Sequence, residues 1–191
     1  MFPKLVLHAC CAPDEAYVVH LLKESRELYC YFSNPNIQPQ EEYDRRRDEA
    51  QRVADRFSVP FVSPPYEPHV WEEAIRGLEN TPEGGARCST CFLLRLRQTA
   101  QFTRQIGWPS FASVMSISPH KNTDMLDEAG RQAAREYDVT YESFNFKKQD
   151  GFRKSIALSN ELGLYRQDYC GCRLSKAERD IRRRKKLIDT Q

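Results

Sequence analysis

Leu5-Val6-Leu7-His8-Ala9-Cys10-Cys11-Ala12-Pro13-Asp14 is the stretch that decides how the chain begins to fold. Its apolar start predicts a short buried strand, which ends at the two adjacent cysteines. Asp14 is a residue type that caps helices, and apolar residues at helical spacing follow it as far as Leu22. The sequence therefore predicts a strand, a turn that carries two thiols, and a helix.

Strands and helices alternate along the rest of the chain. Predicted strands follow at 28–32, 61–62, 111–115 and 139–144, and predicted helices at 41–57, 70–78, 92–106 and 125–137. This alternation predicts an α/β fold, a mostly parallel sheet with helices on both faces. Ligands bind at the carboxyl ends of strands in such sheets. That edge is where we expect Cys10, Cys11, Asp14, His120 and Lys121.

Size and composition predict a single domain. The chain has 191 residues, of which 40% are apolar, which is enough for one hydrophobic core. We place the α/β catalytic domain at 1–175 and a basic C-terminal helix or tail at 176–191. The net charge of +2 is uninformative, but the final segment contains seven Lys and Arg residues. Such a run is often only a solvated helix, yet it also attracts phosphate backbones.

Cysteine usage narrows the chemistry. Six of the seven cysteines form three close groups, at 10–11, 88–91 and 170–172. The sequence has no apolar run typical of a signal peptide or a membrane span, so we expect a cytoplasmic protein with no membrane partner. In the cytoplasm structural disulfides are rare, and clustered cysteines bind metal or perform redox chemistry.

Spacing alone leaves the role of each cysteine group open. Cys88 and Cys91 form a C-x-x-C motif, which serves zinc, iron–sulfur clusters and redox dithiols equally well. Together with Cys10 and Cys11 they offer four thiolates, the usual ligand count of a cubane cluster, although a structural zinc site would use the same set. The C-x-C motif at 170–172 suits a strained, reversible disulfide, or further metal ligation.

Several polar residues have both a structural and a functional interpretation. Asp14 is a helix cap by spacing, but its carboxylate also lies near any metal held by the adjacent cysteines. His120 is either an exposed loop residue or a proton donor. Loop cations are usually solvated, and loops near nucleic acid use them as phosphate anchors. The predicted substrate-binding residues are Lys121, Asn122, Lys147 and Lys148.

Five blocks of sequence resemble the cobalamin-independent epoxyqueuosine reductases of the QueH family. They are LHACCAPD (7–14), YFSNPNI (31–37), CSTCF (88–92), SPHKN (118–122) and YRQDYCGC (165–172). The blocks occur in order along nearly the whole chain, and together they are highly specific. The resemblance implies a Rossmann-like fold of the HUP type, in agreement with the strands and helices predicted above.

The resemblance also implies a reaction, a cofactor and partners. The reaction is reduction of the epoxide of epoxyqueuosine to queuosine at the wobble position of tRNA, with electrons from an external donor. A [4Fe–4S] cluster is implied at Cys10, Cys11, Cys88 and Cys91, and a redox-active dithiol at Cys170 and Cys172. Asp14 stands where some relatives have a cysteine, and it is expected to ligate an additional mononuclear iron.

Two other functions share part of this pattern. A zinc-stabilised RNA-binding module would use the C-x-x-C motif and the basic C-terminal segment without catalysis. A nucleotide-dependent tRNA thiolation enzyme would share the sheet and even a cluster. Such enzymes carry a Gly/Ser-rich phosphate loop after the first strand, however, and here residues 10–14 (CCAPD) occupy that position.

Overall fold

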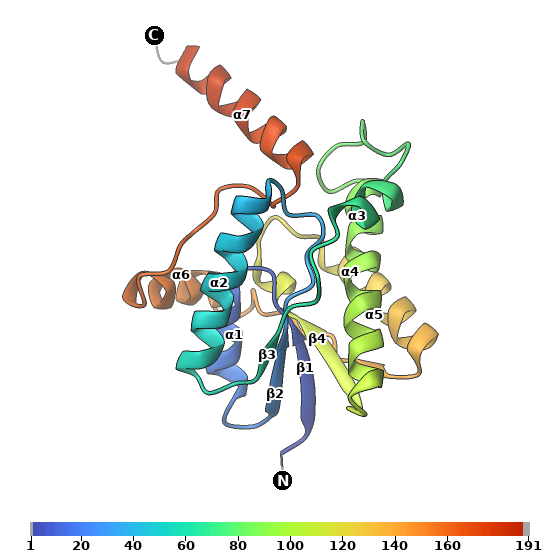
Figure 1. The fold of residues 1–191 in the computed structure, drawn as a ribbon. Helices are drawn as coiled ribbons and strands as arrows, with labels where there is room; N and C mark the ends of the chain where they lie inside the picture. Colours follow the sequence, from blue (N-terminus) through green and yellow to red (C-terminus); the bar gives the residue numbers. More distant parts are fainter. Residues whose placement is uncertain (1, 189–191) are drawn as a thin grey trace.

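The computed structural model describes residues 2–188, in which five parallel strands form one sheet with helices on both faces (Figure 1). The strands are β1 (Lys4–His8), β2 (Glu27–Tyr31), β3 (Phe61–Val62), β4 (Ser110–Ser113) and β5 (Thr140–Tyr141). The helices are α1 (Ala12–Leu22), α2 (Gln40–Arg56), α3 (Pro68–Ala74), α4 (Ala86–Gln105), η1 (Val114–Ile117), α5 (Thr123–Tyr137), α6 (Gly151–Glu161) and α7 (Arg173–Ile188). None of the helices within 2–188 has the length and apolar character that a membrane crossing requires.

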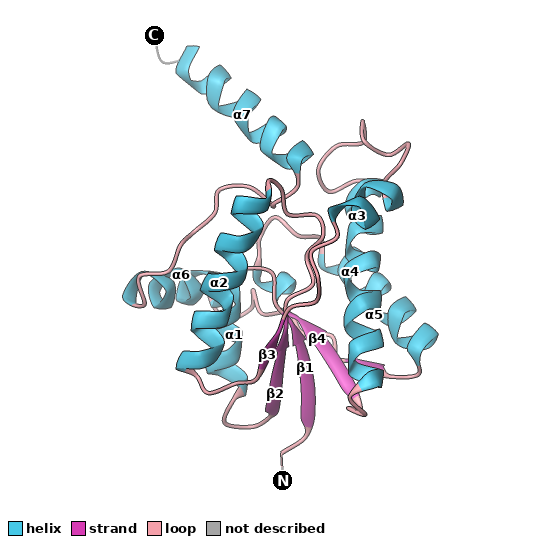
Figure 2. Ribbon diagram, viewed as in Figure 1, coloured by secondary structure: helices cyan, strands magenta, loops and turns pink. Residues whose placement is uncertain are grey.

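The sheet has the order β3-β2-β1-β4-β5, so β1 lies at its centre and is buried on both sides. Leu5 and Leu7 pack in one core cluster with α1, whereas Val6, between them, packs in a second cluster with α4 and α5. A strand buried on both faces needs an unbroken apolar run, and this explains its sequence. Figure 2 shows the resulting layers, with α1, α2 and α6 on one side of the sheet and α4 and α5 on the other.

The start of α1 corrects one prediction. The helix begins at Ala12, and Cys11 is its N-cap residue, so the prediction that Asp14 caps this helix was wrong. Proline is well suited to the first helical turn because its φ angle is already helical and its missing N–H needs no partner there. Pro13 therefore belongs to the helix, and Asp14 lies within the first turn.

The other predicted elements are present with shifted ends. Helix α4 begins at Ala86 rather than at 92, so both cysteines of the C-x-x-C motif lie inside it. Strand β4 ends at Ser113, whose hydroxyl accepts a hydrogen bond from the backbone of Met115 and opens the short helix η1. Strand β5 spans only Thr140–Tyr141 instead of 139–144, because only these two residues pair with β4.

Helix α6 was not predicted from sequence. Its first residue, Gly151, has no room for a side chain, since an ideal Cβ would lie 1.7 Å from the backbone oxygen of Phe146. Helix α7, which carries the basic segment, begins at Arg173 and extends away from the sheet and its covering helices (Figure 1). Residues 189–191 of the predicted basic segment lie outside the described residues.

Candidate functional site

The carboxyl ends of β1 and β4 define the centre of the site. These two strands are neighbours, and the helices that follow them, α1 and α5, cover opposite faces of the sheet. A crevice opens where connections leave in opposite directions, and ligands bind there in sheets of this type. Cys10 and Cys11 follow β1 directly, and Lys121 follows β4 after η1. The structure therefore places Cys10, Cys11 and Lys121 at the carboxyl edge of the sheet, where the sequence led us to expect them.

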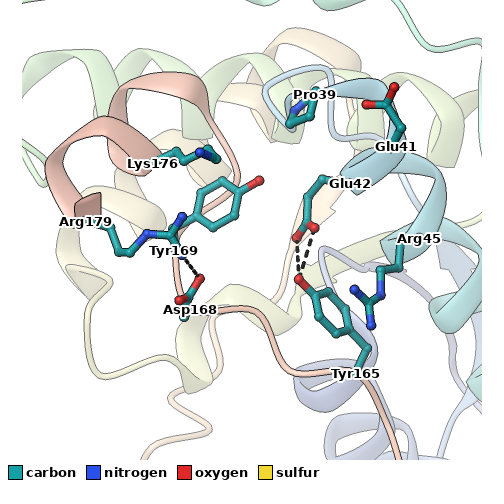
Figure 3. A pocket seen from close by; sticks show the side chains of 9 residues that line it. All are labelled: Pro39, Glu41, Glu42, Arg45, Tyr165, Asp168, Tyr169, Lys176 and Arg179. Carbon is teal, nitrogen blue, oxygen red and sulfur yellow. Dashed lines mark hydrogen bonds and ion pairs between the residues drawn. The ribbon is translucent and has the colours of Figure 1, made fainter. Parts of the chain in front are cut away.

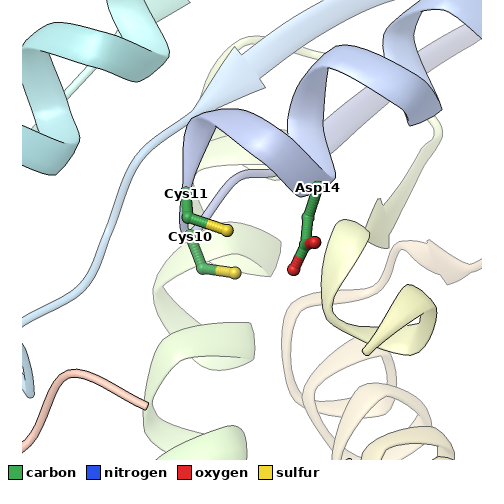
Figure 4. Close-up of side chains that lie close together, drawn as sticks. All are labelled: Cys10, Cys11 and Asp14. Carbon is green, nitrogen blue, oxygen red and sulfur yellow. The ribbon is translucent and has the colours of Figure 1, made fainter. Parts of the chain in front are cut away.

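Cys10, Cys11 and Asp14 form a compact group of potential ligands (Figure 4). One ligand atom from each lies within 4.8 Å of the others. A hydrogen bond between the two thiols lowers the pKa of Cys10, and the same bond together with burial raises the pKa of Cys11. Burial raises the pKa of Asp14 to about 6. Two sulfur atoms and one carboxylate thus meet at the start of α1, as the sequence predicted.

Cys88 and Cys91 occupy the first turns of α4. They are three residues apart, so their side chains lie on the same side of the helix. The backbone N–H of Gly84 donates a hydrogen bond of 3.2 Å to Cys88 Sγ, and burial raises the pKa of both thiols. Cys91 packs in one cluster with Cys172 and Trp71. The C-x-x-C and C-x-C motifs are therefore adjacent in space.

The loop that carries Cys170 is held by α2. Gly171 has a φ of +129°, and its carbonyl accepts a hydrogen bond of 2.9 Å from the backbone of Gln38. Arg46, which is 2% exposed, donates a hydrogen bond of 3.1 Å to the carbonyl of Cys170. A Cβ at position 171 would lie 2.9 Å from Ile37 and 3.1 Å from Arg46. Only glycine combines this backbone conformation with such close neighbours.

Cys172 lies at the N-terminus of α7. Its carbonyl accepts a hydrogen bond of 3.0 Å from the N–H of Lys176, and its Sγ accepts one of 3.3 Å from the N–H of Ser175. The Ser175 hydroxyl in turn accepts a hydrogen bond of 3.1 Å from the N–H of Cys170. Burial raises the pKa of Cys172 to about 12, which keeps this sulfur protonated at neutral pH.

Lys121 links the cysteine groups electrostatically. Its Nζ donates a hydrogen bond of 2.7 Å to Cys170 Sγ. Burial on its own lowers the pKa of Lys121, but the interaction with Cys170 outweighs it and raises that pKa above the ordinary value. The same ammonium also acts to lower the pKa values of Cys10, Cys88 and Cys91. One cation therefore lies close to thiols from all three groups.

Arg95 is a site residue that the sequence analysis missed. It lies on α4 one turn beyond Cys91, is 2% exposed, and donates a hydrogen bond to the side chain of Asn34. The Asn34 amide donates in turn to the carbonyl of Ala9, 2.9 Å away, beside Cys10. The charge of Arg95 acts to lower the pKa values of Cys91 and Cys10. The spacing of four residues from Cys91 was a signal that the sequence offered.

The remaining predicted site residues lie around this centre in varied settings. His120 and Lys148 are exposed, and the Asn122 side chain accepts two backbone hydrogen bonds that cap α5. Lys147 Nζ donates a hydrogen bond of 2.8 Å to the backbone oxygen of Lys121 and so supports that loop. Their contacts with a substrate stay predictions.

The fold and the site together define a class of protein, the Rossmann-like α/β proteins, here with cysteines gathered at the carboxyl edge of the sheet. Similarity to solved structures supports the fold. The U34-tRNA thiolase NcsA from Methanococcus maripaludis, solved with its [4Fe-4S] cluster, matches with a TM-score of 0.56 and 14% identity over 94% of this chain and 65% of its own. A predicted tRNA methyltransferase subunit from Methanocaldococcus jannaschii matches with a TM-score of 0.54 and 12% identity, over 84% and 76%.

Sequence similarity identifies the family. The family model described as epoxyqueuosine reductase QueH matches residues 5–178. The epoxyqueuosine reductase QueH of Streptococcus pyogenes is 39% identical over 89% of this chain and 69% of its own length. That of Thermotoga maritima is 36% identical over 92% of this chain and 91% of its own length. The chain belongs to the epoxyqueuosine reductase QueH family.

Proposed function

We propose that this chain reduces epoxyqueuosine to queuosine at the wobble position of tRNA, in the cytoplasm. The observation that carries the proposal is the meeting of thiols from three distant segments near Lys121, at the ligand-binding edge of a Rossmann-like sheet. Membership of the QueH family supports the same reaction. Reducing compartments such as the cytoplasm keep thiols of this kind free.

The dithiol of Cys170 and Cys172 has the electron count that the reaction needs. Removal of an epoxide oxygen breaks two C–O bonds, forms a C=C bond and releases water, which consumes two electrons and two protons. Oxidation of two thiols to a disulfide supplies two electrons and two protons. An external electron donor then reduces the disulfide again, so that the enzyme can turn over. Gly171 and Arg46 hold the loop in which this exchange takes place.

The four thiols of Cys10, Cys11, Cys88 and Cys91 fit a [4Fe–4S] cluster. Four thiolates are its usual ligands. Arg95 is buried and Lys121 half-buried beside these sulfurs, and cations removed from water need anionic partners, which a thiolate-bound cluster provides. Asp14 adds a carboxylate oxygen beside Cys10 and Cys11, and this oxygen is the proposed ligand of an additional mononuclear iron next to the cluster. When bound, the cluster would pass single electrons, and the mononuclear iron would act as a Lewis acid toward the epoxide oxygen.

The surrounding side chains orient the reactants and supply protons. Lys121 holds the sulfur of Cys170 in place through its hydrogen bond of 2.7 Å. His120, exposed on the same loop, is the proposed proton donor to the departing oxygen. Asn122, Lys147 and Lys148 are proposed to contact the tRNA near the modified nucleotide, which has to leave the anticodon stack to reach the thiols.

The test uses the natural macromolecular substrate. Anaerobically purified protein is incubated with tRNA that carries epoxyqueuosine and with a low-potential reductant, and the tRNA is digested to nucleosides for mass spectrometry. We expect conversion of epoxyqueuosine to a product lighter by one oxygen atom. If protein with its full iron content leaves the epoxide intact, the proposed reaction is wrong.

The start of α1 argues against the nucleotide-dependent alternative. A helix N-terminus binds phosphate through free backbone N–H groups. Here Pro13 removes one N–H from the first turn, and Asp14 places a carboxylate beside it. Cys11, at the cap position, is buried. The segment is therefore suited to thiol and metal chemistry rather than to a nucleoside triphosphate.

A further inference from the structure

A cavity lies between the start of α2, the segment that precedes the C-x-C loop, and the first turns of α7 (Figure 3). Its volume is about 390 Å³, within the range of small-ligand sites. The lining side chains are charged or aromatic, apart from one proline: Pro39, Glu41, Glu42, Arg45, Tyr165, Asp168, Tyr169, Lys176 and Arg179. The reaction proposed above gives this cavity no role.

Two arginine–tyrosine cation–π contacts lie in the walls of the cavity. The guanidinium carbon of Arg45 lies 3.5 Å from the centre of the Tyr165 ring. That of Arg179 lies 5.2 Å from the centre of the Tyr169 ring. Arg45 is exposed, so its guanidinium group is open to a ligand. Guanidinium planes and aromatic rings are the surfaces on which proteins stack unpaired nucleobases.

Glu42 connects these walls to the redox loop. Both of its carboxylate oxygens accept from the Tyr165 hydroxyl, at 3.2 and 3.0 Å, and Oε1 also accepts a hydrogen bond of 2.7 Å from Arg46. Arg46 in turn donates to the carbonyl of Cys170. The Glu42 carboxylate is therefore occupied by hydrogen bonds within the protein. We expect the cavity to recognise a ligand mainly by stacking. Hydrogen bonds run from the wall to the reactive loop without a break.

The charges around the cavity favour a nucleotide within an RNA chain over a free anion. Asp168 and Glu41 line the cavity and oppose an isolated phosphate. Lys176 and Arg179 form ion pairs with Asp180 and Asp168, and further cations follow along α7 as far as Lys186, a run of positive charge that attracts a phosphate backbone. We propose that the cavity holds one unstacked nucleotide of the anticodon loop, adjacent to the nucleotide that is reduced. This inference rests on the proposed function, and it assigns the cavity a sequence-tolerant, stacking role.

Substitution at Arg45 separates stacking from charge. Arg45→Lys keeps the charge but loses the planar group, and Arg45→Ala loses both. The matched control is Arg56→Lys, at the other end of the same helix. We expect both Arg45 variants to raise the Kd for epoxyqueuosine-containing tRNA about tenfold at constant salt, and the control to leave it unchanged. A Kd for Arg45→Lys equal to that of the unaltered protein would overturn the stacking role.

Paired changes in protein and RNA test the contact itself. The tRNA is made with an abasic site at either neighbour of the modified position. For one of the two, the unaltered protein should bind about tenfold more weakly, and Arg45→Lys should cause no further loss, because the stacking partner is already absent. If Arg45→Lys weakens binding to both abasic tRNAs as much as to the intact tRNA, the inference is wrong.

The readout distinguishes this inference from the proposed function. Binding is measured independently of turnover. If the protein reduces the epoxide but Arg45→Lys binds the tRNA with the same Kd as the unaltered protein, only the nucleotide site is refuted. The predicted pattern of Kd values without any loss of the epoxide refutes the proposed reaction and supports the site.

Discussion

Lys121 Nζ lies 2.7 Å from Cys170 Sγ and donates a hydrogen bond to it. The two residues are 49 positions apart, and the contact joins the loop after β4 to the C-x-C loop. The partner Cys172 lies in a different setting, because burial raises its pKa to about 12. The two sulfurs of the motif therefore differ in surroundings: Cys170 Sγ accepts a hydrogen bond from an ammonium group, and Cys172 is buried.

Removal of the ammonium should slow the reaction of Cys170 with alkylating agents. Lys121→Met is expected to lower the alkylation rate about tenfold at pH 7, the effect of losing about 1.5 kcal/mol from a charged hydrogen bond. Lys121→Arg keeps the charge and should retain most of the rate. The rate is followed on the peptide that contains Cys170 by mass spectrometry, with Lys148→Met as the exposed control. An unchanged rate in Lys121→Met would refute this role.

A side chain at Gly171 should displace the redox loop. Gly171→Ala forces a residue with a Cβ into a φ of +129° and against Ile37 and Arg46, at an expected cost of about 3 kcal/mol in unfolding free energy. Gly163→Ala is the matched control, because Gly163 also has a positive φ but no atom within 4 Å of an added Cβ, and we expect it to cost about 1 kcal/mol. Denaturant titration measures both. Equal costs would show that the contacts at position 171 are not tight.

Loss of either thiol of the C-x-C motif should stop repeated turnover. Cys170→Ser and Cys172→Ser each leave one sulfur, so no disulfide forms and no electron pair is stored. Because neither residue is a proposed cluster ligand, visible absorbance of the cluster should be preserved. Product per enzyme is counted over many equivalents of substrate tRNA. Full turnover by either variant rules out the dithiol role.

The cations of α7 should contribute to tRNA binding through the phosphate backbone. Neutralising two of them, Arg184→Gln with Lys185→Gln, is expected to lower the slope of log Kd against log salt by about 1.5. The control is Arg56→Gln with Arg104→Gln, since these residues lie near the C-terminal ends of α2 and α4, at the opposite edge of the sheet. If both pairs change the slope equally, the effect is one of net charge and not of α7.

The sequence predicted the sheet well because its signals are local. Leu5, Val6 and Leu7 form an unbroken apolar run, which is typical of a strand that is buried on both faces. The start of α4 was misplaced because Ala86 and Arg87 carry no apolar periodicity ahead of the cysteines. Helix α6 was missed for a different reason. It begins at a glycine with no capping side chain, and its place depends on contact with the distant α1.

The cysteine site was only partly predictable. Thiols are rare and their spacing is visible, so the three groups were found, and Asp14 lies beside two of them as expected. The roles of Lys121, Arg95 and Arg46 depend on side chains from distant segments meeting at the carboxyl edge of the sheet. No local pattern marks a lysine that will bind a thiol 49 residues away. Such pairs become visible only in three dimensions.

Metal analysis of cysteine variants tests the central claim most directly. Iron and acid-labile sulfide are measured in anaerobically purified protein, in Cys10→Ser and Cys88→Ser, and in Cys30→Ala, which changes a fully buried core cysteine that is not a proposed ligand. We predict about four iron and four sulfide per chain for a single cluster, with up to one further iron at Asp14. We also predict loss of the cluster in both ligand variants and its retention in Cys30→Ala. A single zinc ion per chain, or iron that survives both ligand substitutions, would contradict the account.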